Sequence, residues 1–214
     1  MKIAVLGTGV VGRTIAPRLV ELGHDVVIGT RDPEATRTRD AEFLDGHTDI
    51  RLASFAEAAQ TAELVVNATN GGATLAVLEL AGDALDGKVL VDVSNPLDFS
   101  AGMPPTLFVK DDDSLAEQIQ RAHPRARVVK SLNTLTAELM VRPSSLGRDS
   151  SVFVSGDDAQ AKEVVAGLLR EFGHADVIDL GDITTARGPE MWLPLWLRLW
   201  GALGTPEFNL SIVR

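Results

Sequence analysis

The amino-acid sequence predicts an α/β fold built on a doubly wound, mostly parallel β-sheet. Short apolar runs alternate with helix-length amphipathic segments along nearly all of the 214 residues, which is the pattern of β-α-β units. The apolar runs are rich in Val, Ile and Leu and do not alternate with polar residues, which indicates strands buried on both faces. A small α/β extension of the same sheet is expected at the C-terminal end.

Eight strands are expected, separated by helical segments. The strands cover Lys2–Leu6, Asp25–Ile28, Ile50–Ala53, Leu64–Ala68, Val89–Val93, Arg127–Leu132, Ser151–Ser155 and Asp176–Leu180. The clearest helix is Asp157–Phe172, because Asp157 or Asp158 can cap its first turn and Gly173 can supply a left-handed exit. At the end of the chain, a weak alternation over Phe208–Val213 predicts one more short strand.

Composition and charge exclude several classes of protein. The chain has 20 basic and 30 acidic residues and a net charge of −10, whereas a surface that binds nucleic acid needs an excess of basic residues. It contains no cysteine, so disulfides, thiolate metal sites and cysteine catalysis are excluded. The first residues form a strand rather than a signal peptide, and the apolar run Met191–Gly204 is too short to span a bilayer. A cytoplasmic protein with no membrane contact is therefore expected.

A glycine motif after the first predicted strand indicates a dinucleotide-binding site. Lys2–Leu6 leads into the motif, and a helix follows as far as Leu22. In such motifs the first glycine allows a tight turn, the second lets a pyrophosphate approach the backbone, and the third lets helix and strand pack closely. The N–H groups at the start of the helix bind the anion. The motif predicts a Rossmann-type fold. It assigns to cofactor binding the residues Gly7, Thr8, Gly9, Val10, Val11 and Gly12.

The residues after the second strand favour NADP(H) over NAD(H). Folds of this kind that bind NAD usually carry an acidic residue there, which holds the ribose hydroxyls. This chain has Thr30 and Arg31, a hydroxyl and a guanidinium that suit a 2′-phosphate. Asp32 is the competing acidic residue, but Asp32-Pro33-Glu34 is typical of a helix start in which the aspartate caps the first turn.

Further polar residues follow the neighbouring strands, and ligands gather at the carboxyl ends of the strands in doubly wound sheets. The candidates for cofactor binding after the fourth and fifth strands are Ala68, Thr69, Asn70, Ser94 and Asn95. Small polar side chains suit a ribose and a nicotinamide, although turn formation and helix capping explain the same residue types equally well.

A substrate pocket is expected after the sixth strand, where Asn133 and Thr134 leave the sheet. Lys130 and Asn133 form a Lys-x-x-Asn pair, as in the acid/base pair of hydroxyacid dehydrogenases. That pair is usually carried on a helix, whereas Lys130 falls in a predicted strand, so no catalytic residue is assigned. The chain has no tyrosine, which excludes the chemistry of short-chain dehydrogenases, and no metal site is expected. His24 and His174 are expected to be surface connectors.

The chain divides into a dinucleotide-binding domain, residues 1–140, and a C-terminal extension, residues 141–214. The extension is expected to pack on the same sheet and to complete the substrate pocket. Trp192, Trp196 and Trp200 lie at i, i+4 and i+8, so they share one face of a helix that is too apolar to be solvated. That face suits core packing, a lid over the nicotinamide or a dimer interface, and a homodimer is expected.

The chain resembles, over nearly its full length, the NADPH-dependent reductases of the deazaflavin coenzyme F-420 (F420). The resemblance rests on the segments GTGVVG, LGHDVVIGTRD, VVKSLNT, VSGDDAQAKEVVAGLL and FNLSIVR. It implies that Thr30 and Arg31 hold the 2′-phosphate. The family often adds a basic residue a few positions later, a place that only Arg37 could take here. The chain also departs from the family at Asn133, where members with established deazaflavin activity carry a histidine.

The resemblance implies an oxidoreductase that transfers a hydride between NADP(H) and a small planar electron acceptor, with F420 as the co-substrate. Two alternatives stay open: a reductase of small carbonyl or imine compounds, and an NADPH-sensing module without catalysis. F420 carries an anionic tail, and in an acidic protein such a tail needs local basic residues. Lys130, Arg127 and Arg187 are expected to supply them.

Overall fold

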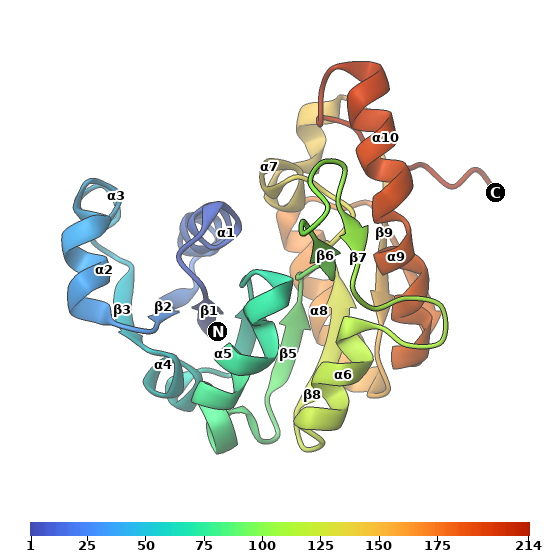
Figure 1. Ribbon diagram of the computed structural model, residues 1–214. Helices are drawn as coiled ribbons and strands as arrows, with labels where there is room; N and C mark the ends of the chain where they lie inside the picture. The colour runs from blue at the N-terminus through green and yellow to red at the C-terminus, as the bar shows by residue number, and fades with distance from the viewer.

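The computed structural model describes residues 1–214 and contains an eight-stranded sheet in the order β10-β9-β8-β5-β4-β1-β2-β3 (Figure 1). Neighbouring strands are parallel except β8 and β9, which run antiparallel. The strands are β1 Lys2–Leu6, β2 Asp25–Thr30, β3 Arg51–Ser54, β4 Leu64–Asn67, β5 Val89–Asp92, β8 Arg127–Ser131, β9 Ser151–Ser155 and β10 Asp176–Gly181. The predicted doubly wound, mostly parallel sheet is confirmed.

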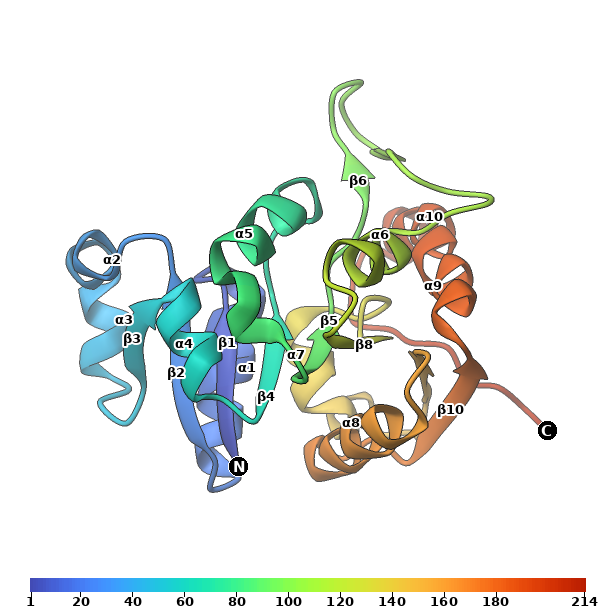
Figure 2. The ribbon, with the colours of Figure 1, turned by 90° about the horizontal axis from the view of Figure 1, so that it is seen from below.

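Helices cover both faces of the sheet, as Figure 2 shows for the half around β5 and β8. One apolar core contains residues of α1 Val10–Glu21, α7 Ala137–Val141 and α8 Ala159–Phe172. The core on the other face contains residues of α4 Phe55–Thr61, α5 Thr74–Ala81 and α6 Leu115–Ala122. All four residues of β4 and of β5 are buried between these two layers, which explains why the first three residues of each strand are apolar.

The remaining helical elements comprise α-helices and short 3₁₀ turns. They are α2 Pro33–Arg39, α3 Ala41–Asp45, α9 Arg187–Met191, α10 Leu193–Leu203 and the 3₁₀ turns η1 Gly71–Ala73, η2 Gly82–Leu85, η3 Pro143–Leu146 and η4 Ile183–Ala186. After β5, β6 Leu97–Asp98 and β7 Thr106–Leu107 form a small antiparallel hairpin that the sequence did not indicate. The cap predicted for α8 is present, since the Asp158 carboxylate accepts from the Ala161 N–H over 2.8 Å.

The prediction of a strand at Phe208–Val213 is wrong. This segment forms no strand, because its backbone hydrogen bonds to the sheet involve only Ser151, at the start of β9, and do not continue as a ladder. The Ser151 N–H donates to the Leu210 carbonyl over 2.8 Å, and the Ile212 N–H donates to the Ser151 hydroxyl. The expectation that His174 lies at the surface is also wrong. His174 is buried, and its Nε2 lies 2.9 Å from the Met140 carbonyl oxygen.

The tryptophan-bearing helix α10 lies beside the β6–β7 hairpin, beyond the carboxyl end of β5 (Figure 1). Trp196 is buried and packs on Trp200 and on Phe208, with ring centroids 5.5 and 5.4 Å apart. Trp200 is 41% exposed and lines a depression between α10 and Met103 of the hairpin. None of the helices is both long enough and apolar enough to cross a membrane.

Candidate functional site

The predicted site residues all lie at the carboxyl edge of the sheet, at or just after the ends of β1, β2, β4, β5 and β8. The loops after β1 and β4 touch, since an added Cβ at Gly7 would lie 2.7 Å from the Ala68 carbonyl. The loops after β5 and β8 touch through Asn95 and Asn133, whose side chains are hydrogen-bonded. The fold therefore brings the predicted site residues together along one edge of the sheet.

The three glycines of the loop after β1 each meet a different constraint. Gly7 has φ +117°, a conformation that favours glycine, and Gly12 packs so closely that an added Cβ would lie 2.1 Å from the Gly7 carbonyl. An added Cβ at Gly9 would meet no atom of the protein within 4 Å. The space above Gly9 is therefore open, as the approach of a pyrophosphate requires.

The start of α1 leaves backbone donors free for an anion. Gly9 is its N-cap and offers no capping side chain, and no acidic residue lies in its first turn. The first N–H groups of a helix have no partner within the helix, so here they face outward unpaired. By contrast, α2 and α4 are capped by Asp32 and Ser54.

At the end of β2 the Arg31 guanidinium is exposed, whereas the Asp32 carboxylate is used to cap α2. The exposed Arg31 side chain makes no hydrogen bond or ion pair, whereas Asp32 accepts from the Ala35 N–H over 3.0 Å as the N-cap of α2. Thr30 is buried, and its hydroxyl lies 2.8 Å from the hydroxyl of Thr36. Thr30 thus holds α2 against β2, while Arg31 is free to meet a ligand.

A second arginine, which the sequence did not single out, reaches the glycine loop. Arg39, at the end of α2, donates to the Thr8 hydroxyl over 2.9 Å and to the Asp40 carboxylate over 2.7 Å. The hydrogen bond from Arg39 holds the pKa of Asp40 below its ordinary value, so this carboxyl stays ionised. Arg37, the basic residue considered from the sequence, makes no hydrogen bond or ion pair and lies exposed on α2.

Buried polar residues orient the hydroxyls of the next two loops. Thr69 donates to Asn67 Oδ1 over 2.6 Å, and Ser94 donates to Asp92 Oδ1 over 2.7 Å. Asn67 and Asp92 are joined by a 2.7 Å hydrogen bond, and both side chains are fully buried. A polar residue at the end of an otherwise apolar strand was the only sequence signal for this pair.

The three basic residues expected to hold an anionic acceptor tail are all engaged elsewhere, so this expectation is wrong. The Lys130 ammonium is fully buried between Asp92 and Glu190, 2.8 Å from each. Burial lowers the pKa of Lys130, but the two carboxylates outweigh it and hold the pKa above its ordinary value. Arg127 begins β8, at the opposite edge from the site, and Arg187 is engaged by the Glu117 carboxylate.

An apolar cavity of about 250 Å³ opens beside Thr134. It is lined by Thr134, Phe153, Leu180, Gly188, Pro189, Trp192 and Leu210, so the C-terminal extension supplies most of its wall. Asn133 does not line this cavity. Its side-chain amide donates to Asn95 Oδ1 and to the Pro189 carbonyl, which fixes α9 beside the loop after β5.

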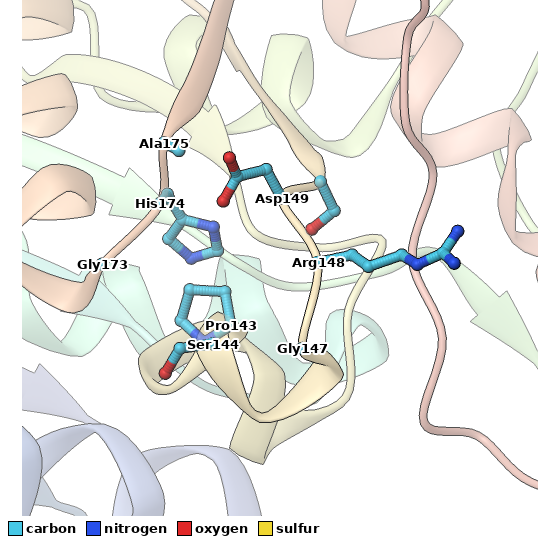
Figure 3. Close-up of a pocket in the computed structure, with 9 residues that line it drawn as sticks. Pro143, Ser144, Gly147, Arg148, Asp149, Gly173, His174 and Ala175 are labelled. Atoms are coloured by element: carbon cyan, nitrogen blue, oxygen red, sulfur yellow. The ribbon is translucent and has the colours of Figure 1, made fainter.

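A larger depression of about 450 Å³ lies apart from the predicted site residues (Figure 3). It is lined by η3, the loop before β9 and the turn before β10, and contains none of the glycine-loop residues. In Figure 3 the Nδ1 side of the His174 ring points toward Asp149. Nδ1 is buried and has no hydrogen-bond partner.

Comparison with known proteins identifies relatives over the whole chain. The family described as NADP oxidoreductase, coenzyme F420-dependent, matches residues 2–96. A crystal structure of a proposed F420-dependent NADP reductase from Arthrobacter sp. FB24 is 62% identical, covers both chains completely and gives a TM-score of 0.98. The F420-dependent NADP reductase of Methanothermobacter marburgensis is 30% identical over 93% of this chain and 92% of its own length. The metalloreductase STEAP3 of Rattus norvegicus is 31% identical, and the matched region spans 38% of its length.

Proposed function

Because the chain belongs to the family of F420-dependent NADP reductases, we propose that it transfers a hydride between NADP(H) and F420. The observation that carries this proposal is the uncapped start of α1 under the open space at Gly9. When bound, the nicotinamide supplies or accepts the hydride, and the deazaflavin ring is its counterpart. The protein's own contribution is to bind the two molecules, orient them and exclude water.

For the dinucleotide, we assign the pyrophosphate to the N–H groups from Thr8 to Gly12. Arg31 is the contact for the 2′-phosphate, because its guanidinium has no partner within the protein. Arg39 is a second cation at the same place, since it already reaches Thr8. The nicotinamide half is assigned to the loops after β4 and β5. The residues proposed there are Ala68, Thr69, Asn70, Ser94 and Asn95.

For the acceptor, we assign the apolar cavity beside Thr134. Its wall of Phe153, Pro189 and Trp192 suits the flat face of an aromatic ring system more than a charged substrate. Residues 141–214 thereby complete the substrate pocket. No titratable side chain lines this cavity, so the proton that accompanies the hydride is assigned to water.

The exposed Trp200 on α10 supports the further proposal of a homodimer, in which a second copy covers this aromatic side chain. The cytoplasmic location stays a prediction from the sequence.

The proposed function is tested by binding and turnover. Titration calorimetry should show tighter binding of NADPH than of NADH. With saturating NADPH, the protein should reduce F420 in a panel that also contains a flavin, a carbonyl compound and a cyclic imine. Turnover of the carbonyl or the imine without F420 would favour the alternative reductase, and tight NADPH binding without any turnover would favour a sensing module.

A further inference from the structure

One fully buried lysine connects the two halves of the proposed site. Lys130, in β8, places its ammonium 2.8 Å from the Asp92 carboxylate and 2.8 Å from the Glu190 carboxylate. The same ammonium donates to the backbone carbonyl of Ser94. All of its hydrogen-bonding capacity is therefore used by β5, the loop after it, and α9.

Each of these partners is itself fixed to another part of the site. Glu190 accepts from the N–H groups of Leu115 and Ala116 over 2.8 and 3.1 Å, which places its charge at the start of α6. Asp92 accepts from the Ser94 hydroxyl and from the Asn67 amide, both over 2.7 Å. The ammonium of Lys130 thus lies at the centre of a network that runs from β4 to the C-terminal extension.

Stability alone does not account for this network. Desolvation offsets most of the attraction within a buried ion pair, and apolar replacements of similar size are often equally stable. What a fully satisfied network does provide is one fixed arrangement of the elements that it joins. Here the joined elements are the loop that contains Ser94, assigned to the nicotinamide, and α9, next to the cavity assigned to the acceptor.

We propose that Lys130 is a positioning residue for hydride transfer, which holds the Ser94 loop and α9 at a fixed separation. This inference rests on the proposed function. Hydride transfer requires the reacting atoms to lie about 3–3.5 Å apart, and a displacement of about 1 Å can cost on the order of a hundredfold in rate. Lys130 touches neither substrate, so its loss should reduce the rate of transfer more than the binding of either substrate.

The test compares Lys130→Met with Lys88→Met. Lys88 also donates to backbone carbonyls, those of Gln60 and Ala62, but it precedes β5 at the amino edge of the sheet, opposite the proposed site. In Lys130→Met we expect the single-turnover rate of F420 reduction to fall about a hundredfold, while the Kd values of NADPH and of F420 each change less than about threefold. Lys88→Met should leave the rate and both Kd values unchanged. A rate within threefold of the wild type, or Kd values that rise in proportion to the loss of rate, would overturn the proposal.

Amide hydrogen exchange gives a readout that needs no acceptor. Exchange should accelerate in Lys130→Met at residues 93–97 and 187–192 and stay unchanged there in Lys88→Met. If wild-type protein does not reduce F420, the proposed function fails. Unchanged exchange at both segments in Lys130→Met would separately overturn the positioning role of Lys130. Should Lys130→Met fail to fold, Glu190→Gln replaces it. Glutamine keeps the shape of the glutamate side chain and one oxygen that can accept from the start of α6. In Glu190→Gln we expect the single-turnover rate to fall about tenfold, with the Kd values of NADPH and F420 again changed less than about threefold.

Discussion

Asn95 and Asn133 are joined by two hydrogen bonds across the carboxyl edge of the sheet. The Asn95 amide donates to the Asn133 carbonyl over 2.8 Å, and the Asn133 amide donates to Asn95 Oδ1 over 2.9 Å. The second amide hydrogen of Asn133 donates to the Pro189 carbonyl over 3.0 Å. Asn133 was expected to line the substrate pocket, but both of its side-chain donors act inside the protein. Its effect on the pocket is therefore transmitted through α9.

Replacement of Asn133 by aspartate should destabilise the fold. In Asn133→Asp a carboxylate would face two oxygen acceptors, so the free energy of unfolding should fall by about 1–3 kcal/mol, measured by urea denaturation. Asn70→Asp is the matched control, because the Asn70 side chain acts only as an acceptor for the Gly72 N–H and aspartate preserves that role. Equal stability of the two variants would contradict this account of Asn133.

Valine substitutions should separate the roles of two glycines. Gly9→Val should abolish NADPH binding in a folded protein, because the new side chain enters the space assigned to the pyrophosphate and its Cβ meets no protein atom within 4 Å. Gly12→Val should instead prevent folding, because its Cβ would collide with the Gly7 carbonyl. Circular dichroism and calorimetric titration check both outcomes. Unchanged NADPH affinity in folded Gly9→Val would remove this loop from the site.

Arg31 should account for the preference for NADPH. Loss of one charge-assisted contact in Arg31→Ala should weaken NADPH binding by roughly ten- to a hundredfold and leave NADH binding nearly unchanged. Arg37→Ala, on the same segment but without any contact to the site, should bind both cofactors like the wild type. The prediction fails if Arg31→Ala retains the wild-type ratio of the two Kd values.

The protein should lose stability in mild acid through His174. Burial holds the pKa of His174 below its ordinary value of 6.5, although its hydrogen bond to the Met140 carbonyl opposes this shift. Near pH 6.5 the unfolded chain therefore binds more protons than the folded chain. The stabilisation present above pH 6.5 is lost as the pH falls through the lower pKa of the folded state. Thermal melts from pH 7.5 to 5 should show a shallower decline for His174→Gln, and an identical decline would exclude His174 as the cause.

Local patterns in the sequence were enough for the fold and for the loops of the site. The eight strands, the glycine loop and the Asp32 and Asp158 caps all follow from residues that are close together in the chain. The contacts of Lys130 could not be predicted in this way, because Asp92 and Glu190 lie 38 and 60 positions from it and neither belongs to a motif. Arg39 was missed for a similar reason, since only the packing of α2 brings it to Thr8. The final strand was predicted wrongly because weak alternation does not show whether a partner strand is available.

The central claim is direct hydride transfer between NADP(H) and F420, and stopped-flow absorbance tests it most directly. Protein saturated with NADPH is mixed with F420, and the absorbance of the oxidised deazaflavin is followed through one turnover. The account predicts a fall in absorbance whose rate decreases when deuterium occupies the transferred position of the nicotinamide. No fall in absorbance at saturating NADPH, together with reduction of a carbonyl or an imine by the same sample, would contradict it.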